Sequence, residues 1–522
     1  MQLRVLVADP IAQEGIDILG RAAQVDVHTG LTPDELEQAI GDYAALIVRS
    51  ESKVTARVLS AGKRLKVVAR AGVGVDNVDV EAATRMGIVV VNAPTGNTVA
   101  AAEHTIALLM ALARHIPQAS ASLQGGEWKR ARFTGVELKG KVLGIIGLGK
   151  VGAEVAKRAQ GLEMQVVATD PYLSTERAAA LSVRAVDLDT LLRGSDFITI
   201  HVPLSTTTGG LVGERELAIV KPGVRIVNVA RGGIVDEDAL VAAISSGRVA
   251  GAAVDVFRQE PVAPDCPLLH NERIIVTPHL GASTTEAQHN VAVDVAEQVV
   301  DILNGRPAKY AVNAPALLPE AEAELAPYLV VADRMGRYFT QVEGGAIDLV
   351  EIVYSGHLAE HNTAALRAAM LRGLLEPICD QPVNLINANI IAADRGIRVQ
   401  ERGELPDETF GNLITLRIGE RSLAGAFLHG EPHIVRINNV SVDLEPKGYL
   451  LVARCCDRPG LLGRIGTVLG QAAVNINSAV FSRPGVDGWS VTVLNVGEAV
   501  PAEVQAQVAA IEGVDRVRLA RF

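Results

Sequence analysis

Residues 141–170 read KVLGIIGLGKVGAEVAKRAQGLEMQVVATD. The apolar run Val142–Ile146 predicts a buried strand, and Gly152–Gln160 predicts the helix that follows it. Between them, residues 147–152 have the form G-x-G-x-x-G, and about twenty residues further on a second strand ends at Asp170. A glycine-rich turn alone also occurs in ordinary strand–helix connections. Here the strand before it, the helix after it and the acidic residue beyond together predict a dinucleotide-binding unit.

Each residue of this motif has its own physical reason. Gly147 permits a tight turn, Gly149 lets the backbone approach a pyrophosphate, and Gly152 lets the helix pack closely on the strand. The helix N-terminus offers free N–H groups and a partial positive charge to phosphate. Asp170 can accept hydrogen bonds from ribose hydroxyls. Because its charge would repel a 2′-phosphate, we expect NAD rather than NADP as the cofactor.

The alternation of strand and helix extends in both directions from this unit. Short apolar runs predict further strands at residues 3–8, 25–28, 44–48, 67–69, 166–169, 197–201, 225–229, 251–255 and 274–277. Helices are predicted between them, among others at residues 33–40, 99–115 and 286–303. Strands that alternate with helices form parallel sheets covered on both faces, so this part of the chain is predicted to be doubly wound α/β.

The remainder of the chain has a different pattern. Asn313-Ala314-Pro315 is typical of a linker, and residues 319–444 mix strands and helices without a catalytic motif. From Gly448 the order is strand, helix, strand, strand, helix, strand, which is the ferredoxin-like arrangement. The predicted elements are residues 449–454, 461–471, 476–481, 490–496, 501–511 and 514–519.

Composition excludes several classes of protein. The net charge is −11 and no Lys/Arg-rich block occurs, which argues against nucleic acid as the main partner. No apolar run reaches the ~18 residues needed to cross a bilayer, and early acidic residues argue against a signal peptide. The four cysteines contain no C-x-x-C pair, so we predict no metal site and expect a reducing, cytoplasmic location.

Three segments follow predicted strands at the sheet edge where open α/β sheets bind ligands. NVARGGIVDEDAL (228–240), AVDVFRQEP (253–261) and TPHLGAST (277–284) contain Arg231, Glu260 and His279. Singly, these residues are equally consistent with a surface ion pair, a loop carboxylate and a core histidine. Together they suit oxidation of a 2-hydroxyacid. A histidine takes the hydroxyl proton, a carboxylate orients the imidazole ring, and an arginine holds the substrate carboxylate.

With ARAGVGVDNVD (69–79) and NAPTGNTVAAAEHT (92–105), these ordered motifs resemble the D-2-hydroxyacid dehydrogenase family over residues 3–315. The resemblance implies that His279 is the acid/base, Glu260 its partner and Arg231 the substrate clamp. It also implies a set of cofactor contacts beyond the glycines and Asp170, namely Lys150, Val151, Val202, Val229, Ala230, Asp255, Gly281 and Ala282. Backbone N–H groups of Val73 and Gly74 would meet the substrate carboxylate.

The long C-terminal extension narrows the resemblance to the branch of the family that oxidises 3-phosphoglycerate, the first step of L-serine synthesis. Arg49, Arg70 and Arg130 or Arg132 would then bind the substrate phosphate; an ordinary solvated surface is the alternative. Residues 453–470 and the following strand resemble an ACT domain, a module that binds amino acids. That implies an L-serine effector held by Asp457 and Asn475, or a purely structural dimerisation domain.

The predicted fold class is therefore α/β, with two doubly wound Rossmann-like lobes, an α+β intervening domain and a ferredoxin-like ACT domain. We expect the substrate lobe at residues 1–97 plus 284–315, the NAD-binding domain at 98–283, the intervening domain at 316–446 and the ACT domain at 447–522. The family implies an allosteric homo-oligomer, a dimer or tetramer. Alternatives are another D-2-hydroxyacid dehydrogenase, such as a glyoxylate or hydroxypyruvate reductase, or an NADH-sensing binding protein on the same fold.

Overall fold

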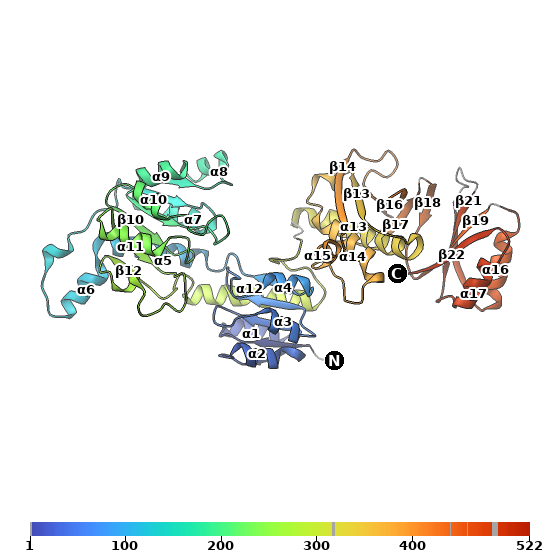
Figure 1. Cartoon of the computed structure of the whole chain (residues 1–522), viewed down its shortest axis with the longest axis horizontal. Coiled ribbons are helices and arrows are strands. Elements are labelled where there is room, and N and C mark those ends of the chain that lie inside the picture. The colour runs from blue at the N-terminus through green and yellow to red at the C-terminus, as the bar shows by residue number, and fades with distance from the viewer. Residues whose placement is uncertain (1–2, 316–318, 439, 457, 483–488) are drawn as a thin grey trace.

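The computed structural model describes residues 3–315, 319–438, 440–456, 458–482 and 489–522. Four sheets follow one another along an extended molecule, with the two parallel sheets at one end and the two mainly antiparallel sheets at the other (Figure 1). The predicted fold class is confirmed, because both parallel sheets are doubly wound and the last four strands form a ferredoxin-like sheet.

The first sheet has the order β2-β1-β3-β4-β5, and all its neighbouring strands are parallel. Its strands are β1 (Arg4–Val7), β2 (Gln24–Val27), β3 (Ala45–Val48), β4 (Val67–Arg70) and β5 (Val89–Asn92). The helices of this lobe are α1 (Gln13–Gly20), α2 (Pro33–Ala39), α3 (Ala56–Ala61), α4 (Val80–Arg85) and, from much later in the chain, α12 (Thr285–Leu303). Apolar side chains of α1 and α12 cover one face, and those of α2, α3 and α4 cover the other.

The second sheet has the order β12-β11-β10-β9-β6-β7-β8, again parallel throughout. Its strands are β6 (Val142–Ile146), β7 (Gln165–Thr169), β8 (Arg184–Ala185), β9 (Phe197–Ile200), β10 (Val224–Asn228), β11 (Val249–Val254) and β12 (Ile274–Val276). The accompanying helices are α5 (Thr98–Arg114), α6 (Ile116–Gln124), α7 (Lys150–Gly161), α8 (Thr175–Ala180), α9 (Leu188–Gly194), α10 (Glu214–Ile219) and α11 (Glu237–Ser245). Strand order reverses between β6 and β9, which is where such sheets bind nucleotides.

The third sheet is mixed and has the order β14-β13-β15-β16-β17-β18. Its strands are β13 (Leu349–Ser355), β14 (Arg398–Glu404), β15 (Leu413–Ile418), β16 (Arg421–Leu428), β17 (Glu431–Ile437) and β18 (Val440–Leu444). Helices α13 (Pro319–Tyr338), α14 (Ala364–Leu375) and α15 (Ala388–Asp394) accompany it. Tyr338, Phe339 and Tyr354 are fully buried in the core between these helices and the sheet.

The last sheet has the order β20-β21-β19-β22, with antiparallel neighbours throughout. Its elements are β19 (Tyr449–Cys456), α16 (Leu461–Gln471), β20 (Ile476–Phe481), β21 (Trp489–Val496), α17 (Ala502–Ala509) and β22 (Val514–Arg521). Each predicted strand and helix of this module is present, within a few residues of its predicted bounds.

Two strands of the parallel sheets were missed by the sequence analysis, and the six strands of the third sheet were predicted only as a mixture of strands and helices. β5 is a run of three valines and an asparagine, and β8 has two exposed residues, so neither carries a clear periodic pattern. Among the described residues, no single helix is long and apolar enough to cross a membrane. One helix pair, α5 with α6, meets that length and composition only when taken together, and it is bent by 62°.

Candidate active site

The glycine turn after β6 has the geometry of a phosphate cradle. Gly147 has φ +92°, which favours glycine, and a Cβ there would lie 2.7 Å from Val202 Cγ1 and the His201 carbonyl oxygen. A Cβ at Gly152 would collide with the carbonyl oxygen of Gly147, so α7 can pack this closely only with glycine. At Gly149 a Cβ would meet nothing within 4 Å, so this side of the turn is open to a ligand.

Asp170 lies at the end of β7, directly beside this turn. Its Oδ2 accepts a hydrogen bond from Leu148 N (2.9 Å), and its Oδ1 accepts one from Tyr172 N (2.9 Å). The first N–H groups of α7, from Lys150 and Val151, have no helical acceptor and point out of the helix end. The open turn, the helix N-terminus and a carboxylate at the neighbouring strand end fit an NAD molecule in the predicted manner.

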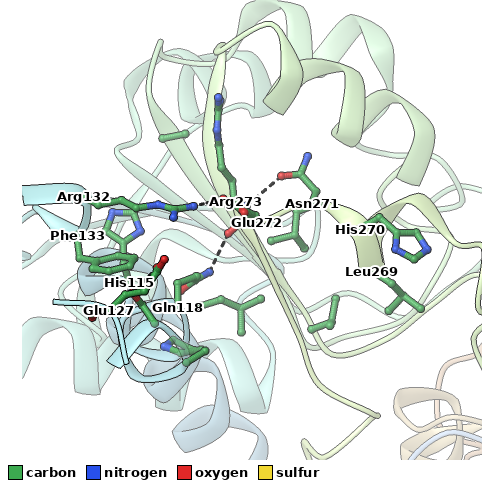
Figure 2. Close-up of a pocket in the computed structure, with 17 residues that line it drawn as sticks. His115, Gln118, Glu127, Arg132, Phe133, Leu269, His270, Asn271, Glu272 and Arg273 are labelled. Carbon is green, nitrogen blue, oxygen red and sulfur yellow. Dashed lines mark hydrogen bonds and ion pairs between the residues drawn. The ribbon is translucent and has the colours of Figure 1, made fainter. Parts of the chain in front are cut away.

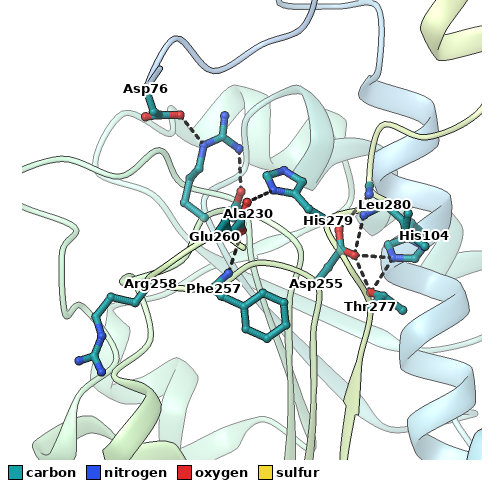
Figure 3. Close-up of polar contacts among 12 residues, drawn as sticks. Asp76, His104, Ala230, Asp255, Phe257, Arg258, Glu260, Thr277, His279 and Leu280 are labelled. Atoms are coloured by element: carbon teal, nitrogen blue, oxygen red, sulfur yellow. Dashed lines mark hydrogen bonds and ion pairs between the residues drawn. The ribbon is translucent and has the colours of Figure 1, made fainter. Parts of the chain in front are cut away.

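A histidine–carboxylate pair lies at the same edge of the second sheet. His279 Nδ1 is 2.7 Å from Glu260 Oε2, and Glu260 Oε1 accepts a hydrogen bond from Phe257 N (2.9 Å) (Figure 3). Burial opposes the charge of Glu260, but the bonds from His279 and Phe257 outweigh it and hold the pKa of this carboxyl below its usual value. The ionised carboxylate fixes Nδ1 as a donor and leaves Nε2 to exchange a proton with a substrate.

Asp255 holds the loop that carries His279. Its side chain is fully buried, and its Oδ1 accepts bonds from Leu280 N (2.8 Å) and Thr277 Oγ1 (2.5 Å), while Oδ2 accepts one from Gly281 N (2.9 Å). The main chain of Asp255 also accepts a bond from His279 N (2.9 Å). His279 itself has φ +55°, a strained conformation for a non-glycine residue, so this bonding network is what keeps its imidazole ring in position.

His104, on α5, completes this cluster and was not singled out by the sequence analysis. Its Nε2 lies 3.2 Å from Asp255 Oδ1 and 3.3 Å from Thr277 Oγ1 (Figure 3). The only signal in the sequence was its place inside the quoted segment 92–105. Because α5 links the two lobes, no local pattern could show that its histidine meets a strand end 151 residues away.

The remaining predicted cofactor residues lie around the turn and the loop. Val202 follows β9 and approaches Gly147, whereas Val229 follows β10 and approaches Gly281. Ala230 N donates to Asn228 Oδ1 (3.1 Å). Ala282 follows Gly281 and is partly exposed. All these residues come from the carboxyl ends of neighbouring strands, where parallel sheets collect their ligand-binding loops.

Three arginines from two different lobes lie within electrostatic reach of one another. Arg49 and Arg70 stand at the ends of the adjacent strands β3 and β4, and Arg231 follows β10 of the second sheet. Arg70 Nε is buried and has no hydrogen-bond partner among the described residues. Burial and the neighbouring cations Arg231 and Arg49 lower the pKa of Arg70 to about 10. A half-buried guanidinium whose Nε is buried without a partner, next to two other arginines, indicates a site for an anion.

The two lobes meet at Arg231. Its Nε is 3.1 Å from Asp76 Oδ2, in the loop after β4, and its Nη1 donates to the Ala230 carbonyl oxygen (2.7 Å). The same loop carries Val73 and Gly74, whose N–H groups donate to no acceptor in the described residues. The predicted clamp and the predicted N–H donors are therefore brought together although they are more than 150 residues apart in the sequence.

Arg132 is not brought to this cluster. It follows α6, at the end of the nucleotide lobe that points away from the first sheet, and its Nη2 pairs with Glu272 Oε2 at 2.5 Å (Figures 1 and 2). Both residues line a separate cavity of about 1020 Å³, together with His115, Gln118 and His270. A phosphate-binding role for Arg132 is therefore not supported by the arrangement within one chain.

The predicted effector residues lie in the last module. Asn475, just before β20, is exposed, and its Nδ2 donates to Asn477 Oδ1 (3.0 Å). Asp457 lies outside the described residues. The structure therefore does not test a ligand site between them.

Comparison with known proteins agrees with this geometry. Residues 106–281 match the model of the D-isomer specific 2-hydroxyacid dehydrogenase NAD binding domain, and residues 324–438 match that of the D-3-phosphoglycerate dehydrogenase intervening domain. The D-3-phosphoglycerate dehydrogenase of Archaeoglobus fulgidus is 44% identical over 519 residues, 98% of each chain. That of Bacillus subtilis is 38% identical over 521 residues, 99% of each chain.

This chain belongs to the D-3-phosphoglycerate dehydrogenase family. Among solved structures, a glyoxylate reductase from Paecilomyes thermophila matches with a TM-score of 0.55 and 30% identity, over 60% of this chain and 98% of that one. The apo-structure of D-lactate dehydrogenase from Escherichia coli matches with a TM-score of 0.54 and 27% identity, over 59% of this chain and 100% of that one. Membership of the D-3-phosphoglycerate dehydrogenase family makes the chain an NAD-dependent oxidoreductase that acts on a CH–OH group.

Proposed function

We propose that this chain oxidises D-3-phosphoglycerate to 3-phosphohydroxypyruvate with NAD, the first step of L-serine biosynthesis. The observation that carries the proposal is Arg70, whose buried Nε has no partner among the described residues, beside Arg49 and Arg231, together with the His279–Glu260 pair on the loops of the second sheet. A substrate with a carboxylate at one end and a phosphate at the other needs more cations than a plain 2-hydroxyacid, and this cluster supplies three.

The residue roles follow from the geometry. His279 Nε2 takes the proton of the substrate hydroxyl, and Glu260 stabilises the imidazolium through Nδ1. Arg231 and the N–H groups of Val73 and Gly74 hold the carboxylate, while Arg49 and Arg70 hold the phosphate. Bound NAD would supply the acceptor for the hydride that leaves C2 of the substrate. The turn residues Gly147, Gly149, Lys150, Val151 and Gly152 with Asp170 would hold its adenosine diphosphate half, and Val202, Val229, Ala230, Gly281 and Ala282 would line the rest.

Asp255 would accept a hydrogen bond from the nicotinamide carboxamide. Its Oδ2 accepts one described bond, from Gly281 N, and a carboxylate oxygen can accept two. The same residue would then both hold the catalytic loop and orient the ring that receives the hydride.

The C-terminal half supports a regulatory proposal. The ferredoxin-like module at the end of the chain has the ACT arrangement, and we propose that it binds L-serine through Asp457 and Asn475 and acts allosterically on a homotetramer in the cytoplasm. The four free cysteines fit a reducing compartment. We propose a division into a substrate lobe (1–97 and 284–315), an NAD domain (98–283), an intervening domain (316–446) and an ACT domain (447–522), and the presence of four separate sheets supports it.

The test is turnover by the full-length chain. NAD reduction at alkaline pH is measured in parallel with D-3-phosphoglycerate, D-lactate and D-glycerate. The assay with the acid that is oxidised is then repeated in the presence of L-serine. Turnover confined to D-3-phosphoglycerate and lost in His279→Ala supports the proposal, and inhibition by serine supports the effector site. Turnover of the unphosphorylated acids alone would overturn the phosphate roles of Arg49 and Arg70. No turnover of any acid would favour an NADH-sensing binding protein instead.

A further inference from the structure

The segment that leaves the dehydrogenase lobes for the C-terminal half is fixed against β5. We call residues 304–315 the connector. Ala311 forms an antiparallel bridge with Val91, and Val312 N donates to the Val90 carbonyl oxygen (2.7 Å). Asn313 accepts a bond from Val90 N (2.8 Å) and donates to the Ile88 carbonyl oxygen (2.9 Å). The connector therefore behaves as part of the first lobe over this stretch.

A buried glutamine ties the connector to α12 and to the substrate loop. Gln298 is 2% exposed; its Oε1 accepts a bond from Tyr310 N (2.8 Å), and its Nε2 donates to the Asn92 carbonyl oxygen (3.0 Å). Asn92 Nδ2 in turn donates to the Val73 carbonyl oxygen (2.6 Å). The backbone of Tyr310 is thus held in a fixed position. Gln298 and Asn92 connect it by hydrogen bonds to the loop that is expected to bind the substrate carboxylate.

The Tyr310 side chain reaches across to the other lobe. Its ring centroid lies 6.0 Å from Lys150 Nζ, the first residue of α7, and 4.9 Å from Lys309 Nζ. Both lysines are exposed and Tyr310 is half-buried. An aromatic face attracts ammonium groups at these distances, so one ring contacts both a connector lysine and a phosphate-turn lysine.

We propose that Lys309 and Tyr310 belong to the dinucleotide site, with Lys309 as a second cation for the pyrophosphate and Tyr310 as the residue that positions both lysines. Asp294, on α12, interacts electrostatically with Lys150 and Lys309 and also with the neighbouring carboxylate of Glu297. The two ammonium groups flank the Tyr310 ring next to the open turn at Gly149 and the N-terminus of α7, where they can meet a doubly charged anion. The inference rests on the proposed role of the glycine turn in binding NAD.

One consequence is a link between cofactor binding and the C-terminal half. Lys150 belongs to the nucleotide lobe, whereas Lys309 and Tyr310 belong to the connector that leads to α13. A pyrophosphate held by both lysines joins the lobes at that point, so any displacement of the connector changes the affinity for the cofactor.

The test compares charged and uncharged fragments of the cofactor. NADH binding to the full-length chain is followed by fluorescence, and ADP and adenosine are then used as competitors. For Lys309→Met we expect the affinity for ADP to fall about threefold to fivefold and that for adenosine to stay unchanged. Tyr310→Ala should lower the affinity for ADP to the same extent and leave that for adenosine unchanged. Tyr310→Phe should bind both competitors with the affinities of the unaltered chain. Lys157→Met, an exposed lysine two turns further along α7, is the matched control and should change neither affinity.

Three results would overturn the inference. Unchanged ADP affinity in both Lys309→Met and Tyr310→Ala would show that Lys309 and Tyr310 do not belong to the dinucleotide site. An equal loss for ADP and adenosine in Lys309→Met would indicate a general structural effect rather than a phosphate contact. Failure of the unaltered chain to bind NADH would overturn the role of the glycine turn itself. That outcome is distinguishable because it needs no variant.

Discussion

Replacing Asp255 by asparagine removes a charge without changing the size of the side chain, and it tests how the catalytic loop is held. The carboxylate accepts hydrogen bonds from the main-chain N–H groups of both Leu280 and Gly281. An asparagine can accept only one of these bonds, because its amide NH₂ would face the other N–H. The loss of a charge-assisted bond costs about 1.5–3 kcal/mol, and the unsatisfied buried N–H costs about 1–3 kcal/mol more. We therefore expect a local destabilisation of about 3–5 kcal/mol.

The assay is hydrogen–deuterium exchange of the segment that contains Leu280 and Gly281. A destabilisation of this size corresponds to exchange that is about a hundredfold to a few thousandfold faster in Asp255→Asn. Since His279 sits on the same loop, kcat should fall by about a hundredfold. Asp265→Asn, an exposed carboxyl on a nearby loop, is the control and should change neither quantity. Unchanged protection together with near-normal kcat in Asp255→Asn would refute the reasoning.

The loss of stability in Asp255→Asn should depend on pH. Burial opposes the charge of Asp255, but the bonds from His104, Thr277 and Leu280 outweigh it, so its pKa lies below the ordinary 3.8. A carboxyl with a lowered pKa in the folded protein stabilises it above the unfolded pKa, and this contribution is lost as pH falls through the folded pKa. The difference in thermal midpoint between the unaltered chain and Asp255→Asn should be full at pH 7 and shrink below about pH 4. A difference that stays constant down to pH 3 would contradict the assignment of the charge to this site.

Three further predictions concern the cofactor turn, the substrate and the proton. Gly152→Ala should raise the Kd for NADH about tenfold, because its Cβ collides with the Gly147 carbonyl oxygen. Gly161→Ala, at the open end of the same helix, should leave the Kd unchanged. Equal Kd values for the two variants would show that the close packing at Gly152 is not needed for NADH binding. Arg70→Met should raise KM for D-3-phosphoglycerate about tenfold to a hundredfold and that for D-glycerate much less; an equal rise for both acids would show that Arg70 does not bind the phosphate. His279→Gln should lower kcat by about 10²–10⁴-fold, with a smaller loss in Glu260→Gln, in steady-state assays; activity retained in His279→Gln would exclude it as the acid/base.

The sequence predicted the order of secondary structure well where hydrophobic patterns are long. The ferredoxin-like module and the strand–turn–helix at residues 142–160 were predicted close to their observed bounds, because most of these elements begin or end next to a glycine or proline. β5 was missed because four residues carry no periodicity. Arg132 was grouped with Arg49 and Arg70 through the family resemblance, and the sequence does not say which end of a lobe its loop occupies within one chain.

The sequence by itself determined the fold class, the cofactor turn and the three residue types of the catalytic chemistry, because these depend on local spacing and on which strand each motif follows. Only the tertiary structure decided which residues meet across the two lobes. Arg70 with Arg231, Asp76 with Arg231, His104 with Asp255 and Lys150 with Tyr310 are all pairs far apart in sequence. The physical reason is that each contact is set by where α5, α12 and the connector carry the chain between the lobes. That path depends on how two separate cores fold around segments distant in sequence, which no local pattern records.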